Sequence, residues 1–396
     1  MTDHETPETM QLTENADGIH GMRAREELAP HVAKWWNTYE ITPGAPLYKR
    51  EFGYYCLDAW KAQGMPEDVP LAELFDYDEG AVAGLWDLGW CEAAFQPTFD
   101  WELIEDRGEH QVVQDFAGRH VLVFKDQPAS FMPEYLDHPV KDQRTWEEKV
   151  KWRLDPGSAE RLQDHEQKMC DVRKAAGDGL MVVEHVVGGY MYLRSLIGPE
   201  ETFYIVHDQP DLIHACMKTW FDLADAVIAR HQQHVTIDQI FLAEDICYNC
   251  GPLIGPDMMK EFLFPYYQQL IANLRSRQID QSRHLYVHID TDGCVMPVIP
   301  WYREAIGMDA MLPFEVASGC DVVEIGKQYP DLVMSGGIDK RVLAQGKDDI
   351  DRMVERILPV MRERGGYTPT CDHGVPEEVS LDNYLHYRKR CIELGG

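Results

Sequence analysis

The second half of the chain is built from short apolar runs that alternate with longer stretches of helical periodicity, starting at Gly179. The apolar runs are residues 180–183, 239–243, 284–288, 310–314, 332–335 and 367–370. This alternation is typical of βα units, in which helices cover a parallel sheet. Polar or glycine residues follow each run, so polar groups gather after several separate strands. That pattern favours a (β/α)8 TIM barrel of the α/β class, with an open doubly wound sheet as the alternative.

The first half of the chain has a different composition. Residues 1–20 are polar and acidic, which predicts a mobile acidic tail. Residues 21–396 suit a single barrel domain, with 21–150 as a cap and the first elements and 179–396 as the main βα repeats. Alternating apolar residues between 105 and 125 predict a small β hairpin insertion. The N-terminal cap is rich in aromatic residues, among them Trp35, Trp36, Tyr48, Phe52, Tyr54, Tyr55, Trp60, Trp86, Trp90, Phe95, Phe99 and Trp101.

The net charge of −31 restricts the partners that this protein can have. Nucleic acids require clustered lysine and arginine, and acidic membranes repel such a chain, so neither is expected as a partner. No apolar run approaches the roughly 18 residues of a membrane span, and the polar start lacks the regions of a signal peptide, which predicts a cytoplasmic protein. The 10 cysteines are scattered and indicate reduced thiols. A homodimer is compatible with these features.

The strongest candidate for chemistry is the stretch from His288 through Asp290 to Asp292, where an apolar run ends. Residues two apart in a strand point to the same side, so His288 and Asp290 can face one point. An imidazole and a carboxylate suit a Zn²⁺ or Fe²⁺ site, and they equally suit an acid–base pair. A buried histidine held by a neighbouring carboxylate is the structural alternative.

A second candidate follows the last apolar run, at Cys371, Asp372 and His373. His373 or Cys371 can complete a site begun by His288 and Asp290, with either two imidazoles and one carboxylate or a set that contains sulfur. In the simpler alternative, Asp372 caps the following turn and His373 binds the backbone.

Two adjacent carboxylates, Glu244 and Asp245, form a third candidate after the run at 239–243. Cys247 and Cys250 in the same loop have the spacing of a zinc-ribbon pair. Because no second pair of this spacing exists in the sequence, we expect them to be ordinary loop or core residues.

Later runs contribute two further carboxylates. Glu315 follows the run at 310–314, and Asp339 follows Gly336 and Gly337, where the missing side chains let a ligand approach the backbone. A helix cap is the alternative role of Asp339. The motifs of P-loop NTPases, Rossmann dehydrogenases and α/β-hydrolases do not occur in a usable context, which argues against those classes.

Several stretches of the chain are similar to the uroporphyrinogen decarboxylase superfamily. They are Pro46–Pro66 with Glu51-Phe52-Gly53-Tyr54, Glu244-Asp245 with Gly251-Pro252-Leu253-Ile254, Leu332–Lys340 with Leu343–Gly346, Gly365-Gly366-Tyr367, and Asp372–Pro376 before Asn383-Tyr384. The resemblance spans most of residues 22–394. It implies a TIM barrel with the active site at the carboxyl ends of its strands.

Two branches of this superfamily differ in function. Uroporphyrinogen decarboxylases carry an arginine-rich N-terminal signature that binds substrate propionates, whereas this chain has Met22-Arg23-Ala24-Arg25 in an unlike context. Cobalamin-dependent methyltransferases hold zinc through a His-x-Cys pair and a later Cys. His288 falls at the His of that pair and Asp290 replaces its Cys. His373 stands at the place of the later Cys, with Cys371 two residues away.

The resemblance therefore implies a methyltransferase that moves a methyl group between a small methylated ether or amine and a corrinoid protein, with a zinc ion activating the leaving atom. The candidate metal ligands are His288, Asp290, His373 and Cys371. The candidate acid–base groups are Glu244, Asp245 and Asp292. The candidate substrate contacts are Tyr54, Tyr248, Glu315 and Asp339. A metal-independent decarboxylase and a non-catalytic binding protein are the alternatives.

Overall fold

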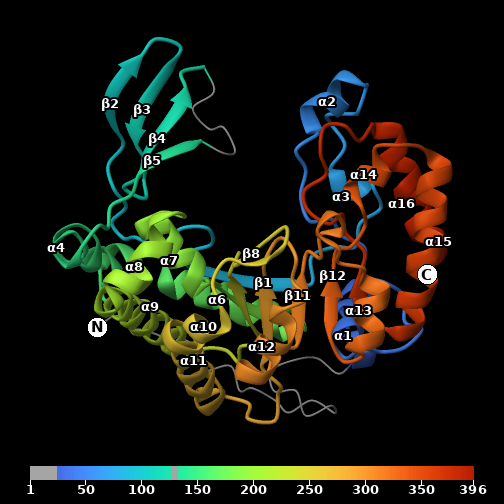
Figure 1. The fold of residues 1–396 in the computed structure, drawn as a ribbon. Coiled ribbons are helices and arrows are strands. Elements are labelled where there is room, and N and C mark those ends of the chain that lie inside the picture. Colours follow the sequence, from blue (N-terminus) through green and yellow to red (C-terminus); the bar gives the residue numbers. More distant parts are fainter. Residues whose placement is uncertain (1–24, 127–132) are drawn as a thin grey trace, which may run out of the picture.

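The computed structural model describes residues 25–126 and 133–396 (Figure 1), so the predicted acidic tail lies outside the described residues. Its central feature is a sheet of seven strands in the order β1-β6-β7-β10-β11-β12-β13, in which each neighbouring pair is parallel. The strands are β1 (Val82–Leu88), β6 (Met181–Val187), β7 (Gln239–Ala243), β10 (Tyr286–Asp290), β11 (Ala310–Leu312), β12 (Val333–Ser335) and β13 (Tyr367–Thr368). All six predicted strands are present, and β1 is an addition to them.

Helices surround this sheet. The longer ones are α1 (Pro30–Tyr39), α6 (His165–Gly177), α7 (Gly189–Ile197), α8 (Glu201–Asp208), α9 (Pro210–His231), α11 (Phe264–Arg277), α12 (Val298–Ile306), α15 (Lys347–Arg364) and α16 (Leu381–Gly395). The shorter ones are α2 (Leu57–Ala62), α3 (Leu71–Leu74), α4 (Gln143–Thr145), α5 (Ala159–Leu162), α10 (Pro256–Phe262), α13 (Val322–Gln328) and α14 (Lys340–Leu343). Parallel strands in sequence order, each followed by helical cover, make this fold a TIM barrel and confirm the predicted fold class.

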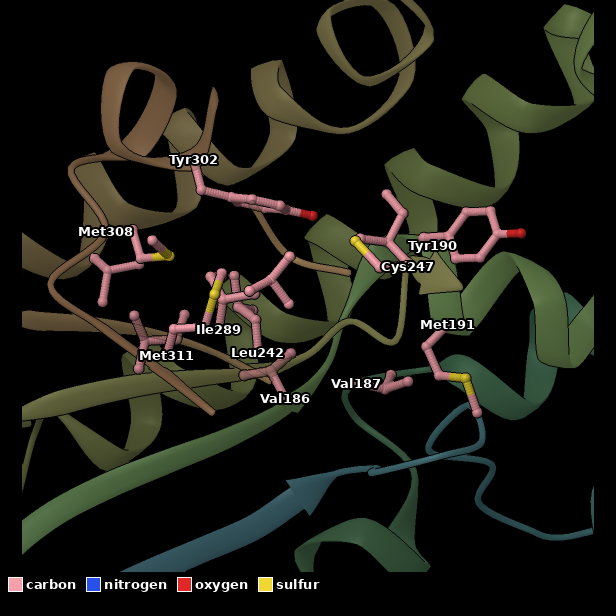
Figure 2. Packing of buried hydrophobic residues seen from close by; sticks show 14 of the residues in the cluster. Val186, Val187, Tyr190, Met191, Leu242, Cys247, Ile289, Tyr302, Met308 and Met311 are labelled. Carbon is pink, nitrogen blue, oxygen red and sulfur yellow. The ribbon is translucent and has the colours of Figure 1, made fainter. Parts of the chain in front are cut away.

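The two faces of each barrel strand have different neighbours, because successive side chains point to opposite sides. Every residue of β6 is buried, as expected for a strand that is covered on both faces. One face packs under the helices in the large apolar core. Figure 2 shows this layer, in which the strand residues are Val186, Leu242, Ile289 and Met311 and the helix residues are Tyr190 and Tyr302.

The opposite face of the strands lines the barrel interior in layers. His185, Phe241 and His288 are in register across β6, β7 and β10 and form one such layer. Two residues further along each strand, Val187, Ala243 and Asp290 form the next layer toward the carboxyl ends. Helix α1 closes the amino ends of the strands. Its contacts there are Trp35 Nε1 to Met181 Sδ, at 3.4 Å, and the packing of the Tyr39 ring on the Tyr286 ring.

An antiparallel sheet in the order β2-β3-β4-β5 projects from the barrel (Figure 1). Its strands are β2 (Glu102–Arg107), β3 (His110–Gln114), β4 (His120–Phe124) and β5 (Glu134–Asp137). The predicted small β insertion is therefore present, with four strands in place of a single hairpin. A short hairpin of β8 (Cys247–Tyr248) and β9 (Gly251–Pro252) follows β7.

The segment before α2 ties the N-terminal region to the end of the chain. The Tyr55 amide donates to the Val375 carbonyl at 2.9 Å. The buried Glu51 carboxylate accepts hydrogen bonds from the Cys371 amide, at 2.7 Å, and from the Tyr384 hydroxyl, at 2.6 Å. The aromatic-rich N-terminal part is thus a packed component of the barrel. No helix in the described part of the chain has the length and apolar character that a membrane crossing requires.

Candidate active site

His288 lies deep in the barrel, where its side chain is 5% exposed. Its Nδ1 atom lies 3.2 Å from the Tyr39 hydroxyl and also contacts the side-chain amide of Gln239. Its Nε2 atom has no hydrogen-bond partner among the described residues. Burial, assisted by the positive charge of Arg50, lowers the pKa of His288 to about 3. The imidazole is therefore neutral at physiological pH.

Three carboxyl groups gather at the carboxyl ends of β7 and β10: Asp245, Asp290 and Asp292. Burial raises the pKa of Asp290 well above its usual value, and the charges of Asp292 and Asp245 raise it further. The backbone brings these groups together, because the amides of Glu244 and Asp245 both donate to the Asp290 carbonyl, at 2.8 and 3.1 Å. Asp245 has a φ of 43°, a left-handed conformation that is costly for a residue with a side chain.

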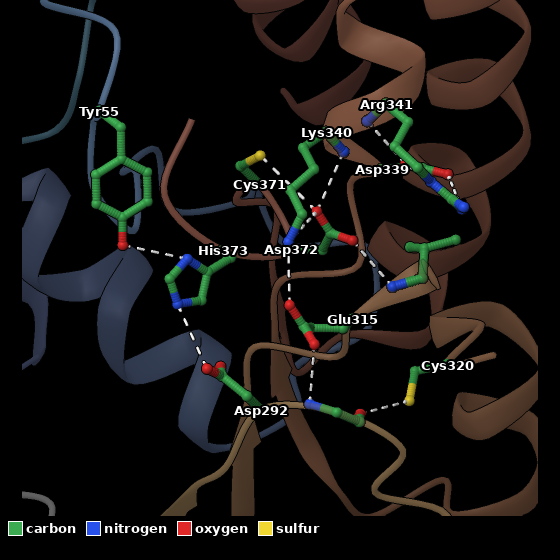
Figure 3. A network of polar contacts seen from close by, with 12 residues as sticks. Tyr55, Asp292, Glu315, Cys320, Asp339, Lys340, Arg341, Cys371, Asp372 and His373 are labelled. Carbon is green, nitrogen blue, oxygen red and sulfur yellow. Dashed lines mark hydrogen bonds and ion pairs between the residues drawn. The ribbon is translucent and has the colours of Figure 1, made fainter. Parts of the chain in front are cut away.

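His373 lies on the loop after β13 and pairs with Asp292 (Figure 3). Its Nε2 atom is 3.5 Å from Asp292 Oδ2, and its Nδ1 atom is 3.3 Å from the Tyr55 hydroxyl, whose ring stacks on the imidazole. Burial lowers the pKa of His373, but the contact with Asp292 outweighs it and the pKa is raised overall. His373 and Asp292 therefore form an acid–base pair at the barrel mouth.

The predicted metal ligands do not form a common centre. Among residues 25–126 and 133–396, no three His, Cys, Asp or Glu side chains form a group that could hold a metal ion. His288 bonds toward the amino end of the barrel, whereas His373 pairs with Asp292. The buried Cys371 thiol lies 4.0 Å from a carboxylate oxygen of Asp372, and burial raises its pKa well above the usual value. These donors do not fit one shared ion, and zinc remains a prediction from the sequence.

Glu244, a predicted acid–base group, faces away from this mouth. Its side chain is fully buried and accepts hydrogen bonds from the Tyr267 hydroxyl, at 2.5 Å, and from the Tyr190 amide, at 3.0 Å. Burial raises its pKa to about 7, while the bond from Tyr267 opposes that rise. Glu244 therefore holds the start of α7 against α11. Of the two adjacent carboxylates, only Asp245 joins the mouth cluster.

Glu315 belongs to a second polar network, close to His373 (Figure 3). It accepts hydrogen bonds from the Gly293 amide and from Lys340 Nζ, both at 3.0 Å. Asp372 accepts from the amides of Val316 and Lys340 and so joins the loops that follow β11, β12 and β13. Asp339 instead caps α14 and pairs with Arg341 at 2.8 Å. The helix-cap alternative describes its contacts better than a substrate contact.

The two predicted substrate-binding tyrosines lie in different surroundings. Tyr54 packs between Trp60 and Phe75, and its hydroxyl lies 2.5 Å from that of Tyr77, so this hydroxyl already has a partner inside the protein. Tyr248 is an exposed residue of the β8–β9 hairpin, whose backbone carbonyl accepts from the Cys294 amide at 2.9 Å. Only Tyr248 is free to approach a ligand.

Three residues of the site escaped the sequence analysis. Arg194 of α7 forms an ion pair with Asp245 at 2.5 Å. Cys91 lies near the same carboxylates, and burial together with negative neighbours raises its pKa to about 12. Arg50 lies beside the deep layer, with its guanidinium 5.6 Å from the centre of the Trp35 ring. None follows a predicted strand, so the strand-end rule does not find them, although Arg50 is within the stretch that resembles the superfamily.

The comparisons with known proteins identify the family of this chain. The sequence model of the family described as uroporphyrinogen decarboxylase (URO-D) matches residues 133–393, and the chain therefore belongs to this family. A uroporphyrinogen decarboxylase from Hydrogenobaculum sp. (strain Y04AAS1) is 23% identical over 143 residues. That match covers 34% of this chain and 36% of the relative, so the chain spans about a third of the length of that relative. The resemblance inferred from the sequence is confirmed.

A solved structure supports the fold along nearly the whole chain. A methyltransferase from Methanosarcina mazei superposes with a TM-score of 0.57 and 13% sequence identity, covering 92% of this chain and 98% of that one. At such low identity the similarity shows a shared fold. The substrate of this protein has to be argued from its own residues.

Proposed function

We propose that this protein is a methyltransferase that moves a methyl group from a small, uncharged methylated compound to a corrinoid protein. The observation that carries the proposal is the charge of the mouth. Asp245, Asp290 and Asp292 lie together there, while the nearby cations Arg194 and Lys340 are both held in ion pairs. Such a mouth disfavours a substrate with many carboxylates, because Arg194 and Lys340 are already paired with carboxylates of the protein.

The residues of the mouth suit the departure of a methyl group from an oxygen or nitrogen atom. The bond between that atom and the methyl carbon breaks, and its electron pair stays on the leaving atom. His373, whose pKa is raised by Asp292, supplies the proton that the leaving atom takes up, and Asp292 holds the imidazole in place at 3.5 Å. The reduced corrinoid of the partner protein supplies the electron pair for the new bond to the methyl carbon.

The test is methyl transfer by the purified protein to a reduced corrinoid protein, with a panel of methyl ethers and methylamines and with absorbance of the corrinoid as the signal. His373→Ala is expected to lower the rate about 100-fold or more, the usual contribution of a general acid. His386→Ala is the matched control, because His386 pairs with Asp351 on the outer helices and is 21% exposed, like His373. Equal rates for wild type and His373→Ala would refute the role of His373.

Decarboxylation is the second candidate function, and Arg50 is the observation that favours it. Arg50 forms no ion pair or hydrogen bond with any described residue, so it is available to a substrate carboxylate. Release of carbon dioxide from a carboxylic acid, without any corrinoid protein, would support this candidate. Loss of that release in Arg50→Gln, with no methyl transfer from any donor, would replace the methyltransferase proposal.

A further inference from the structure

Strand β1 places an aromatic ring on the inner side of the barrel. The pairing of β1 with β6 shifts register between Leu85 and Leu88, which marks a β-bulge. Leu85 is fully buried under the helices, and Asp87 contacts His231 of α9 on that same outer side. Between them, the Trp86 ring lies against His185, an interior residue of β6. Trp86 therefore points inward by the ordinary alternation of the strand, on the same side as Gly84, and the register shift follows it.

Trp86 and His185 form a flat double layer. Their ring centres are 3.5 Å apart and their planes differ by 8°, which is a parallel stack. His185 and its neighbour Phe241 are almost fully buried, but Trp86 is 58% exposed. One face of the indole is therefore covered by the imidazole, and a large part of the ring remains open to a ligand. A tryptophan this exposed on the inner side of a barrel strand offers a flat apolar surface to a ligand.

The neighbouring residues maintain this open position. Gly84 precedes Trp86 on the same face, and a Cβ atom at Gly84 would lie 2.5 Å from Trp86 Nε1. The absence of a side chain at Gly84 thus leaves the space that the indole occupies. Trp90 extends the aromatic wall, since its ring lies 5.5 Å from Trp86 and is stacked on Phe241 at 5.2 Å.

The surrounding charges indicate which kind of ring fits. Burial and the nearby Arg50 lower the pKa of His185 to about 3, so the layer beneath Trp86 is neutral and has a positive charge beside it. A cationic ligand is repelled by Arg50. An anionic ligand meets the carboxylate of Asp245, whose charge also raises the pKa of Cys91, the residue after Trp90. A flat uncharged ring is repelled by neither charge, and it can stack on the open face of the indole.

We infer that Trp86 is a stacking platform for an uncharged aromatic ring of the substrate, which makes the methyl donor a methoxyarene. The choice of a methyl ether rests on the proposed methyl transfer. The aromatic platform itself rests on the inward position of Trp86, its stack on His185 and its exposure.

Calorimetric titration with 4-methoxyphenol tests the platform without any corrinoid protein. Trp86→Leu is expected to weaken binding on the order of tenfold, because stacking on an aromatic side chain is lost. Trp86→Phe should retain most of the affinity. Trp101→Leu is the matched control, since Trp101 is similarly exposed, at 62%, but lies just before β2 of the projecting sheet. Circular dichroism of each variant verifies that it is folded.

Two further probes separate the classes of ligand. 4-Methoxycyclohexanol has the same oxygen groups without a flat ring and is expected to bind at least tenfold more weakly than 4-methoxyphenol. Unchanged affinity in Trp86→Leu, or tighter binding of tetramethylammonium than of 4-methoxyphenol, would overturn the platform. Trp86-dependent binding without any methyl transfer would leave the platform standing and refute the proposed function. Methyl transfer from aliphatic donors alone would leave the proposed function standing and overturn the platform.

Discussion

His288 and His373 were predicted to share one metal ion, yet the structure gives them opposite surroundings. His288 is enclosed by the barrel, next to Arg50, and its pKa falls to about 3. His373 lies at the mouth beside Asp292, and its pKa rises. The comparison shows that position along the barrel axis, more than residue type, decides which histidine can give a proton. Of the two, only His373 has a raised pKa.

The largest expected difference between the two histidines is in turnover. His373→Gln should lower kcat about 100-fold or more, because the leaving atom loses its proton donor. His288→Gln should cost less than about tenfold, because a neutral imidazole at this depth transfers no proton. Steady-state rates of corrinoid methylation check both variants. Losses of equal size would contradict the comparison and favour an ion shared by the two rings.

The effects on stability should have the opposite order, with a larger loss for the His288 variant than for the His373 variant. His288→Ala removes a buried ring and is expected to lower the free energy of unfolding by about 2–4 kcal/mol, through lost packing and the cavity that remains. His373→Ala removes a partly exposed ring and its exposed ion pair, and should cost less than about 1 kcal/mol. Urea unfolding followed by circular dichroism measures both changes. A larger loss for His373→Ala would show that the mouth, and not the interior, holds the barrel together.

The pH dependence of stability should have opposite signs at the two residues. His373, with a raised pKa, contributes stability that is complete below pH 6.5 and is lost as the pH rises through its folded pKa. His288 remains neutral down to about pH 3, so the unfolded chain binds its proton first and stability falls as the pH drops below 6.5. Proton NMR of the imidazoles resolves the two titrations. Asp292→Asn should bring the pKa of His373 down and leave His288 unchanged.

Zinc should have the smallest effect. Because no group of three ligands exists in the described residues, equimolar Zn²⁺ is expected to raise Tm by about 1 °C or less, as weak binding stabilises little. Differential scanning calorimetry measures this shift, and elemental analysis counts the bound ion. One zinc per chain that survives dialysis, and that both His288→Ala and His373→Ala release, would show that the two rings converge after all.

The order of the barrel strands was predictable, but one strand was not. Uninterrupted apolar runs such as 239–243 identify strands that are buried on both faces. β1 was missed because Gly84, Trp86 and Asp87 interrupt its apolar pattern, and its register shift exists only in the pairing with β6. The aromatic density of that region suggested a cap, whereas Trp86 belongs to the barrel wall.

The end of the barrel at which the candidate residues gather was predictable, but the distance of each residue from that end was not. The strand-end rule correctly placed Asp245, Asp290, Asp292 and His373 at the carboxyl ends of the strands. The rule that residues two apart share a face also held for His288 and Asp290, but it ignores the roughly 6.6 Å between them along a strand. That distance puts His288 in a lower layer. The pairing of His373 with Asp292 depends on loops far apart in sequence, for which no local pattern exists.

The part of the chain that matches the family is shorter than the part that packs together in the structure. The stretch shared with the family, residues 133–393, begins after β1 and after Glu51. A fragment trimmed to that stretch would leave the outer edge of β6 without its partner strand and the Cys371 amide without its acceptor. Expression designs guided by homology alone would therefore lack one of the seven strands of the sheet, and the segment that contains Glu51 and β1 belongs in any fragment intended to fold.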